Sequence, residues 1–353
     1  MTTKQYIFGF ILALLVLTGF AGMGMRVDPA MAQVYNQPGT GTKSAVILAY
    51  HRVSDIDQGY ALSTQDFKDH LKYFTQTNTQ FLTGSGLFQS GEEHKTLITF
   101  EGGYRSSYEN AMKLLIERGI PFLLMVSPAR IERGAPAYMG WDDVKALQET
   151  GLVEVGLLPN SYRDITRLDE KALSALINKD IRYFERELGT RPKYISVPHG
   201  GYSQRNLETL EKYDFKHVFG LHSGVAHLKT GDGVLPRFSL TNGYSAMERL
   251  KTILDAQPLI MTNITPADRL QKAASGLAIG FTLDTTHTRS DKALYCFASD
   301  YGRIPLVKMG ESRYEIRFDT ELQPGRLRIN CTQACPAPEN CTLWQGMMFT
   351  LQE

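Results

Sequence analysis

Three side chains that could carry acid–base or metal chemistry each follow a short apolar run in this 353-residue sequence, namely His51, Glu101 and His199. A buried carboxylate can act as a general base, and a carboxylate with two imidazoles is a donor set that binds divalent cations. In a simpler interpretation, both histidines hydrogen-bond within loops and Glu101 has no catalytic role. The sequence favours this simpler interpretation, because it places neither a second carboxylate nor a close histidine pair beside these residues.

The elements that must position these residues alternate between short apolar runs and amphipathic segments. Runs typical of strands buried on both faces occur at residues 44–51, 97–100, 122–127, 153–157, 194–197, 217–220 and 234–237. Helical spacing occurs between them, at residues 108–118, 141–149, 169–188 and 245–256. This alternation predicts parallel strands joined by helical crossovers. Because active-site residues of barrel folds collect where parallel strands end, the three side chains are expected at the same edge.

Several motifs occur in an order that resembles one protein family. The segment Thr99-Phe100-Glu101-Gly102-Gly103-Tyr104 resembles the first motif of the polysaccharide deacetylases (NodB homology, carbohydrate esterase family 4), in which two aspartates act as catalytic base and metal ligand. Residues 47–53, 197–202 and 235–237 are similar to other segments of the subgroup that deacetylates poly-N-acetylglucosamine. The resemblance covers roughly residues 45–256 and implies an α/β fold, an irregular (β/α) barrel of the NodB type.

The resemblance also implies that the family's metal ligands are absent. Gly102 stands where the ligating aspartate is expected, and Leu158 and Tyr162 stand at the two histidine positions of the second motif. A bound metal polarises the amide carbonyl and lowers the pKa of water in such sites. We therefore expect impaired metal-dependent N-deacetylation, with no cofactor and with Glu101 left at the base position. Zinc is expected only if His51, Glu101 and His199 rebuild a site.

Aromatic and imidazole side chains on the same loops indicate a different use. Rings combined with a few polar groups are typical of ligand sites, which predicts a glycan cleft containing five residues, His51, Tyr104, Trp141, His199 and Tyr202. The expected ligand is a polysaccharide containing N-acetylated amino sugars.

A glycosidase-like mechanism would need a second carboxylate about 5 to 10 Å from Glu101. Asp142, Asp143 and Glu154 are the nearest candidates by topology. Asp142 and Asp143 stand at a predicted helix start, however, so N-capping is the simpler role.

The N-terminus has the pattern of an exported protein. Residues 1–32 combine an apolar core with the small-residue segment Ala30-Met31-Ala32, which predicts a secretory signal peptide; an uncleaved anchor is the alternative. Residues 33–43 are rich in turn-forming and polar residues and are expected to form a flexible linker. The expected location is the periplasm or outside the cell. A formal net charge of +1 gives no basic stripe for nucleic acid.

After Pro258 the residue pattern changes from alternating strands and helices to short β-rich runs separated by turn residues. Residues 262–266 are predicted as a linker between a deacetylase-like domain at 44–260 and a small β-rich domain at 270–353. All four cysteines lie there, and in an exported protein they are expected to form disulfides. Of the three possible pairings, the pairing favoured here joins Cys296 with Cys331 and Cys335 with Cys341. A structural zinc site is the competing interpretation, with poor spacing for it.

Taken together, the motifs predict an exported polysaccharide deacetylase-family protein that acts as a glycan-binding or accessory pseudoenzyme in envelope or exopolysaccharide metabolism. Two alternatives remain open. One is an active hydrolase that deacetylates N-acetylated polysaccharide through a rebuilt site. The other is a structural interaction module that binds an envelope protein.

Overall fold

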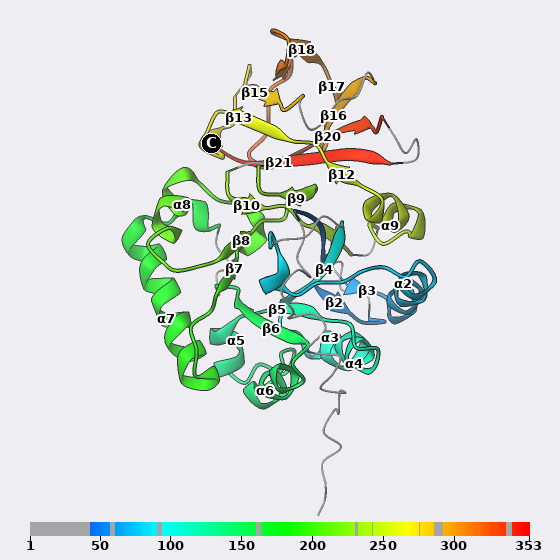
Figure 1. Cartoon of the computed structure of the whole chain (residues 1–353). Coiled ribbons are helices and arrows are strands. Elements are labelled where there is room, and N and C mark those ends of the chain that lie inside the picture. The colour runs from blue at the N-terminus through cyan, green and yellow to red at the C-terminus, as the bar shows by residue number, and fades with distance from the viewer. Residues whose placement is uncertain are drawn as a thin grey trace, which may run out of the picture.

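The first two thirds of the chain form a parallel sheet that curves into a nearly closed barrel (Figure 1). The computed structural model describes residues 43–56, 61–89, 94–159, 164–229, 232–241, 243–274, 276–285, 292–336 and 341–353. In sheet order the strands are β10 (Val234–Leu235), β8 (His217–Phe219), β7 (Tyr194–Ser196), β6 (Val153–Leu157), β5 (Phe122–Val126), β4 (Lys95–Gly102), β1 (Ser44–Tyr50) and β11 (Phe238–Leu240). All neighbours on this path are parallel, and β9 (Val225–His227) adds an antiparallel partner to β1.

Helices surround this sheet, as the alternating sequence pattern predicts (Figure 1). They are α2 (Thr64–Gln76), α3 (Arg105–Ser107), α4 (Lys113–Glu117), α5 (Pro128–Glu132), α6 (Trp141–Glu149), α7 (Glu170–Leu188), α8 (Gln204–Leu210) and α9 (Met247–Leu254). Helix α7 begins where Asp169 Oδ1 accepts the Ala172 N–H at 2.7 Å, and it ends at Gly189 with a φ of 70°. A π-helical turn, Tyr108–Met112, joins α3 to α4 directly after the candidate site loop.

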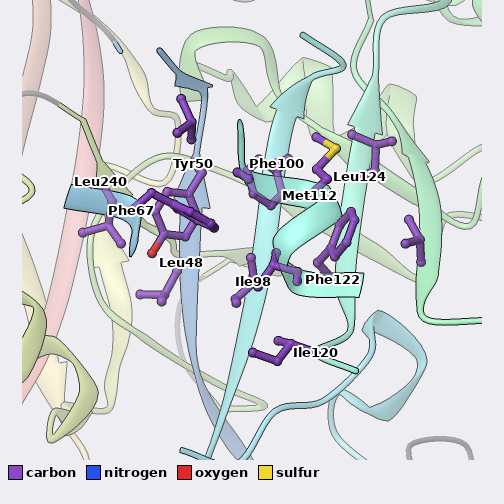
Figure 2. Close-up of a cluster of buried hydrophobic side chains, with 14 of the residues drawn as sticks. Leu48, Tyr50, Phe67, Ile98, Phe100, Met112, Ile120, Phe122, Leu124 and Leu240 are labelled. Carbon is purple, nitrogen blue, oxygen red and sulfur yellow. The ribbon is translucent and has the colours of Figure 1, made fainter. Parts of the chain in front are cut away.

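The core shows which strand residues face the barrel interior. Leu48, Tyr50, Ile98 and Phe100 lie together with the buried face of the helices (Figure 2). The alternate residues of the same strands, including Leu97, belong to a separate cluster inside the barrel. Because successive side chains of a strand point to opposite faces, the residues of β4 that alternate with Phe100 point inward. This periodicity directs Glu101 into the barrel.

Two details of the barrel differ from the sequence-based prediction. Residues 217–220 and 234–237 were expected to be the final strands, but β9 and β11 lie between and beyond them. Both additional strands pair with β1. They are three residues long, too short to show a reliable periodicity.

The C-terminal part consists of two further sheets. One has the order β12 (Gln257–Pro258), β21 (Thr342–Gln352), β20 (Gly325–Ala334), β16 (Leu294–Ala298) and β17 (Gly302–Ile304), with β14 (Leu270–Lys272) also on β21. The other has the order β13 (Met261–Thr265), β15 (Ala278–Leu283), β19 (Arg313–Arg317) and β18 (Leu306–Lys308). The linker prediction for residues 262–266 is wrong, because most of that segment is strand β13.

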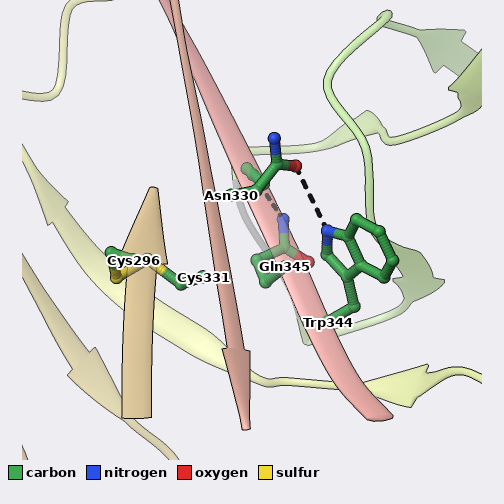
Figure 3. Close-up of a disulfide and its surroundings, with 6 residues drawn as sticks. Cys296, Asn330, Cys331, Trp344 and Gln345 are labelled. Atoms are coloured by element: carbon green, nitrogen blue, oxygen red, sulfur yellow. Dashed lines mark hydrogen bonds between the residues drawn. A yellow bond between two sulfur atoms is a disulfide. The ribbon is translucent and has the colours of Figure 1, made fainter. Parts of the chain in front are cut away.

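Both predicted disulfides are confirmed. Cys296 and Cys331 face each other across β16 and β20 (Figure 3), and Cys335 is joined to Cys341. Disulfides persist in oxidising compartments, which fits an extracellular or periplasmic location. Within the described ranges, no helix is both long and apolar enough to cross a membrane. The predicted signal peptide at 1–32 lies outside those ranges.

The β sheets pack closely against the barrel. The Trp344 ring meets Phe238 edge-on, with 5.1 Å between ring centroids, and its Nε1 donates to Asn330 Oδ1 at 3.1 Å (Figure 3). At Gly346, an added Cβ would lie 2.2 Å from the Ser223 carbonyl oxygen. A side chain at that position would therefore separate the two parts.

Candidate functional site

The carboxyl ends of the barrel strands surround one pocket of about 410 Å³. His51 follows β1, Glu101 and Gly102 end β4, Leu158 follows β6, and His199 lies in the turn after β7. Further lining residues follow strands β1, β4, β5, β6, β7 and β8, namely Arg52, Tyr104, Ser127, Arg130, Ala137, Tyr138, Pro159, Pro198 and Leu221. The structure thus brings the three chemically capable side chains of the sequence analysis to one pocket.

Glu101 is held at the pocket floor by the buried side chain of Arg237, for which the sequence predicted no site role. Arg237 Nη1 lies 2.6 Å from Glu101 Oε2, and the two side chains are 0% and 6% exposed. Ser196 Oγ donates to the other carboxylate oxygen at 2.6 Å and accepts Arg237 Nη2 at 2.7 Å. The guanidinium also donates to the Gly220 carbonyl at 2.8 Å. Both oxygens of Glu101 are therefore engaged by donors.

This pairing decides the ionisation of Glu101. Burial opposes the charged form and would raise the pKa, but the charge and hydrogen bond of Arg237, with His51 and Ser196, lower the pKa below its usual range. A carboxylate with a lowered pKa is a weak base near neutral pH. The geometry thus favours a structural ion pair at this position.

The two histidines of the pocket are held neutral. Desolvation lowers the pKa of His51, and it also lowers the pKa of His199. His51 Nδ1 is buried without a hydrogen-bond partner in the described part of the chain. His199 has a φ of 58°, and its carbonyl oxygen accepts Arg326 Nη1 at 3.3 Å from the C-terminal sheet. The β domain therefore touches the turn that supports this rim of the pocket.

The resemblance in sequence places the expected metal-ligand positions at residues 102, 158 and 162. Gly102 has no side chain, Leu158 is apolar, and Tyr162 lies outside the described residues. Gly102 has a φ of +97°, and an added Cβ would lie 2.8 Å from Cε2 of Tyr104. Among the described residues, no group of three or more His, Cys, Asp or Glu side chains is arranged to hold a metal ion.

A stack of two arginines and two tyrosines forms one wall of the pocket. The Arg52 guanidinium lies 4.3 Å from the centre of the Tyr104 ring, and the Tyr104 and Tyr138 rings lie 4.9 Å apart. Arg130 lies 5.4 Å from the centre of the Tyr138 ring. Burial, then Tyr104, raises the pKa of Tyr138 to about 12. The Tyr138 hydroxyl therefore stays protonated at neutral pH.

Two predicted glycan-cleft residues lie elsewhere. Tyr202 is buried, and its hydroxyl donates to Asp232 at 2.8 Å. Trp141 packs against the core, and its Nε1 donates to Glu132 at 2.6 Å. Neither side chain lines the pocket.

The candidate second carboxylates are also absent from the pocket lining. Glu154 accepts the Ser85 N–H at 2.9 Å. Asp143 accepts the Gly140 N–H at 2.8 Å, which is the capping role predicted for this helix start. Asp142 is exposed on the same turn.

Comparison with known proteins agrees with this geometry. Residues 88–218 match the family model described as Polysaccharide deacetylase. The YxkH protein of Bacillus subtilis (strain 168), named as a polysaccharide deacetylase, is 21% identical over 205 residues, which cover 56% of this chain and 72% of that protein. Among solved structures, IcaB from Ammonifex degensii is 23% identical with a TM-score of 0.53, covering 61% of this chain and 99% of its own. The Streptococcus pyogenes deacetylase PplD is 16% identical with a TM-score of 0.53, over 60% of this chain and 98% of its own.

The family-model match includes Glu101, Gly102, Leu158 and His199 of the pocket lining. The barrel therefore has the fold of these solved deacetylases, and residues 88–218 within it resemble the polysaccharide deacetylase family.

Proposed function

We propose that this chain is an exported glycan-binding member of its family in which metal-dependent N-deacetylation is impaired. The observation that carries the proposal is the loop at Gly102, where the Tyr104 ring lies against the place a ligating side chain would need. Leu158 removes a second donor from the same pocket. Without a metal to polarise the amide carbonyl, the family reaction loses several kcal/mol of transition-state stabilisation.

Glycan binding is supported by what the pocket retains. Its lining combines apolar surface from Leu158 and Pro198 with the hydroxyls and imidazoles of Tyr104, His51 and His199. A concave site with a few convergent polar groups is the usual form of a small-ligand pocket. N-acetylated amino sugars of an envelope polysaccharide are the proposed ligands, in keeping with the family.

The proposal is tested with purified protein and N-acetylglucosamine oligomers. We expect binding by titration calorimetry, no acetate release, and no stoichiometric Zn, Co or Ni after dialysis against each metal. Tyr104→Ala should weaken binding, whereas Trp141→Phe, outside the pocket lining, should not. Stoichiometric metal together with acetate release would instead establish the hydrolase alternative through His51, Glu101 and His199.

A reverse experiment tests the assignment of the ligand positions. Gly102→Asp, Leu158→His and Tyr162→His should restore metal uptake when combined with Tyr104→Ala, because an added Cβ at position 102 would otherwise meet the Tyr104 ring. Without Tyr104→Ala, uptake should be weaker. Failure of the quadruple variant to take up metal while remaining folded would contradict the assignment of these positions.

A further inference from the structure

A second cavity, of about 630 Å³, lies where the two C-terminal sheets meet, away from the barrel (Figure 1). The chain passes from β17 to β18 through the single residue Pro305, so both sheets contribute to its walls. Its lining includes Tyr295, Arg303, Leu306, Lys308, Tyr314 and Gln333, which are all distinct from the lining of the barrel pocket. Because small-ligand pockets usually measure about 300–1,000 Å³, this volume suits a short segment of a polymer.

Two cations in this lining have no counter-charge among the described residues. Within those residues, neither Arg303 nor Lys308 forms an ion pair, and no carboxylate lines the cavity. Glu315 lies beside Tyr314 in β19, but successive side chains of a strand point to opposite faces, and Glu315 is paired with Arg317. The cavity therefore has an excess of positive charge.

Arg303 is positioned by an aromatic ring of the neighbouring strand. Its guanidinium lies 4.4 Å from the centre of the Tyr295 ring. Phe297 faces Arg303 directly across β16 and β17, so Tyr295 is the diagonal neighbour that a long side chain can reach. Arg303 donates no hydrogen bond within the described part of the chain, so its planar fork is available. Such a fork matches a carboxylate or phosphate through two parallel hydrogen bonds.

Both walls of the cavity rest on fixed elements. Cys296, the residue after Tyr295, is bonded to Cys331 of β20 (Figure 3). On the opposite wall, the Tyr314 ring stacks on Phe281, with 5.9 Å between the ring centroids and 18° between the ring planes. A site whose side chains are already held in place loses less freedom when it binds a ligand.

Neutral hydrogen-bonding groups accompany the two cations. Gln333 is 7% exposed, and its Nε2 donates to the Lys292 carbonyl oxygen at 2.7 Å. Among the described residues, Gln333 Oε1 and the hydroxyls of Tyr295 and Tyr314 form no hydrogen bond. These groups can bind the hydroxyls of a ligand, whereas the cations require an anion. An acidic sugar carries both kinds of group, and an inorganic anion would leave the neutral groups unused.

We propose that this cavity is a carbohydrate site, separate from the barrel pocket, that receives an acidic sugar unit of a polysaccharide. Arg303 and Lys308 bind its anionic group, and Gln333 with the two tyrosine hydroxyls binds its hydroxyl groups. A uronic acid carboxylate and a sugar phosphate share this chemistry. The inference goes beyond the function proposed for the barrel pocket and does not depend on it.

The test uses ligands that differ only in their charged groups. Calorimetry compares a galacturonic acid trisaccharide with the same trisaccharide after reduction of its carboxyl groups to alcohols. We expect the charged form to bind about ten- to a hundredfold more tightly, the range for hydrogen bonds to charged groups. Raising the salt concentration should weaken binding of the charged form alone. Glucuronic acid and glucose 6-phosphate, each compared with glucose, distinguish carboxylate from phosphate as the preferred anion.

Variants assign the charge preference to this cavity. Arg303→Gln should remove most of it, and Arg303→Lys should retain only part, because an ammonium group keeps the charge without the planar fork. Lys308→Gln should reduce it. Arg317→Gln is the matched control, because Arg317 lies in β19 outside the cavity lining. All three side chains are exposed, so the variants should fold, which circular dichroism and the unfolding temperature verify.

Tyr104→Ala separates this cavity from the barrel pocket. Tyr104 lines the barrel pocket and not this cavity, so the variant should keep the full preference for the charged trisaccharide. Loss of that preference in Tyr104→Ala would place the acidic sugar in the barrel and overturn the inference. Binding of neutral N-acetylglucosamine oligomers tests the barrel function separately.

The remaining outcomes bear on the cavity alone. Equal affinity for the charged and reduced trisaccharides, or absence of binding to either, overturns the inference and leaves the barrel function standing. A charge preference that survives Arg303→Gln and Lys308→Gln, or that disappears in Arg317→Gln, overturns the assignment to this cavity. Vesicles containing phosphatidylglycerol are the last comparison. Binding to these vesicles that Arg303→Gln abolishes, without binding of the acidic trisaccharide, would overturn the choice of a sugar as the ligand.

Discussion

The Glu101–Arg237 pair gives a prediction about stability that a double-variant cycle can measure. Glu101→Leu leaves a guanidinium buried without its counter-charge, and Arg237→Met leaves a carboxylate in the same condition. The double variant contains neither of these buried, unpaired charges. If the pair is a structural ion pair, each single variant should be strongly destabilised and the double variant should recover part of the loss.

The size of the effect follows from the burial of the pair. The two side chains are 0% and 6% exposed, so each single substitution should lower the free energy of unfolding by about 3–5 kcal/mol. The double variant still leaves the Gly220 carbonyl, which Arg237 Nε reaches at 2.8 Å, without this donor. We expect its loss to be about 1–3 kcal/mol, the cost of an unsatisfied buried group.

The assay is urea unfolding at pH 7, followed by far-ultraviolet circular dichroism, for wild type, both single variants and the double variant. Non-additivity is the decisive quantity, because the two single losses sum to about 6–10 kcal/mol, well above the loss of about 1–3 kcal/mol expected of the double variant, whereas the losses of distant residues add. A double variant that loses the sum of the two single losses would refute the argument. Single variants within about 0.5 kcal/mol of wild type, the range of ordinary surface substitutions, would refute it equally.

Three further predictions concern other parts of the molecule. Burial lowers the pKa of His222 to about 4 from its ordinary 6.5, so the unfolded chain binds the proton first and the free energy of unfolding falls by about 3 kcal/mol as the pH drops from 6.5 to 4. His222→Gln should reduce this dependence of the unfolding free energy on pH. An unchanged pH dependence would contradict the prediction. The Cys296–Cys331 bond joins residues 35 apart in sequence and restricts the unfolded chain, so replacing both cysteines by serine should lower the free energy of unfolding in urea by about 4 kcal/mol. A loss below about 1 kcal/mol would contradict this entropic origin of the stability. Trp344→Ala removes a partly buried ring that packs on Phe238 and should cost about 1–3 kcal/mol, with separate calorimetric transitions for barrel and sheets. A single unshifted transition would exclude a role in coupling them.

Features that depend on neighbouring residues were predictable from the sequence. Helix α7 follows from its apolar spacing, from Asp169 before it and from Gly189 after it, and the structure confirms both caps. The disulfide between Cys335 and Cys341 spans a short turn-prone segment, so its pairing was accessible from spacing. The convergence of His51, Glu101 and His199 followed from the rule that parallel strand ends share one edge.

Features that depend on distant residues were not predictable in the same way. Glu101 and Arg237 are 136 residues apart in sequence, and an arginine after a strand carries no signal that it will be fully buried. Arg130 reaches the pocket from α5, the helix after β5, which has no motif of its own. Period-2 alternation in β4 did contain one usable signal, because it directs Glu101 to the barrel interior, where an isolated charge requires a partner.

Gly102 links the proposed loss of metal chemistry to the position of the Tyr104 ring in the pocket wall. An L-residue with its φ of +97° would cost about 1–3 kcal/mol in backbone strain, and its Cβ would meet the Tyr104 ring at 2.8 Å. That ring is in turn packed between contacts with Arg52 and Tyr138. A ligating aspartate at position 102 would therefore displace a ring of the pocket wall. A variant that gains metal uptake by this route should lose affinity for N-acetylglucosamine oligomers.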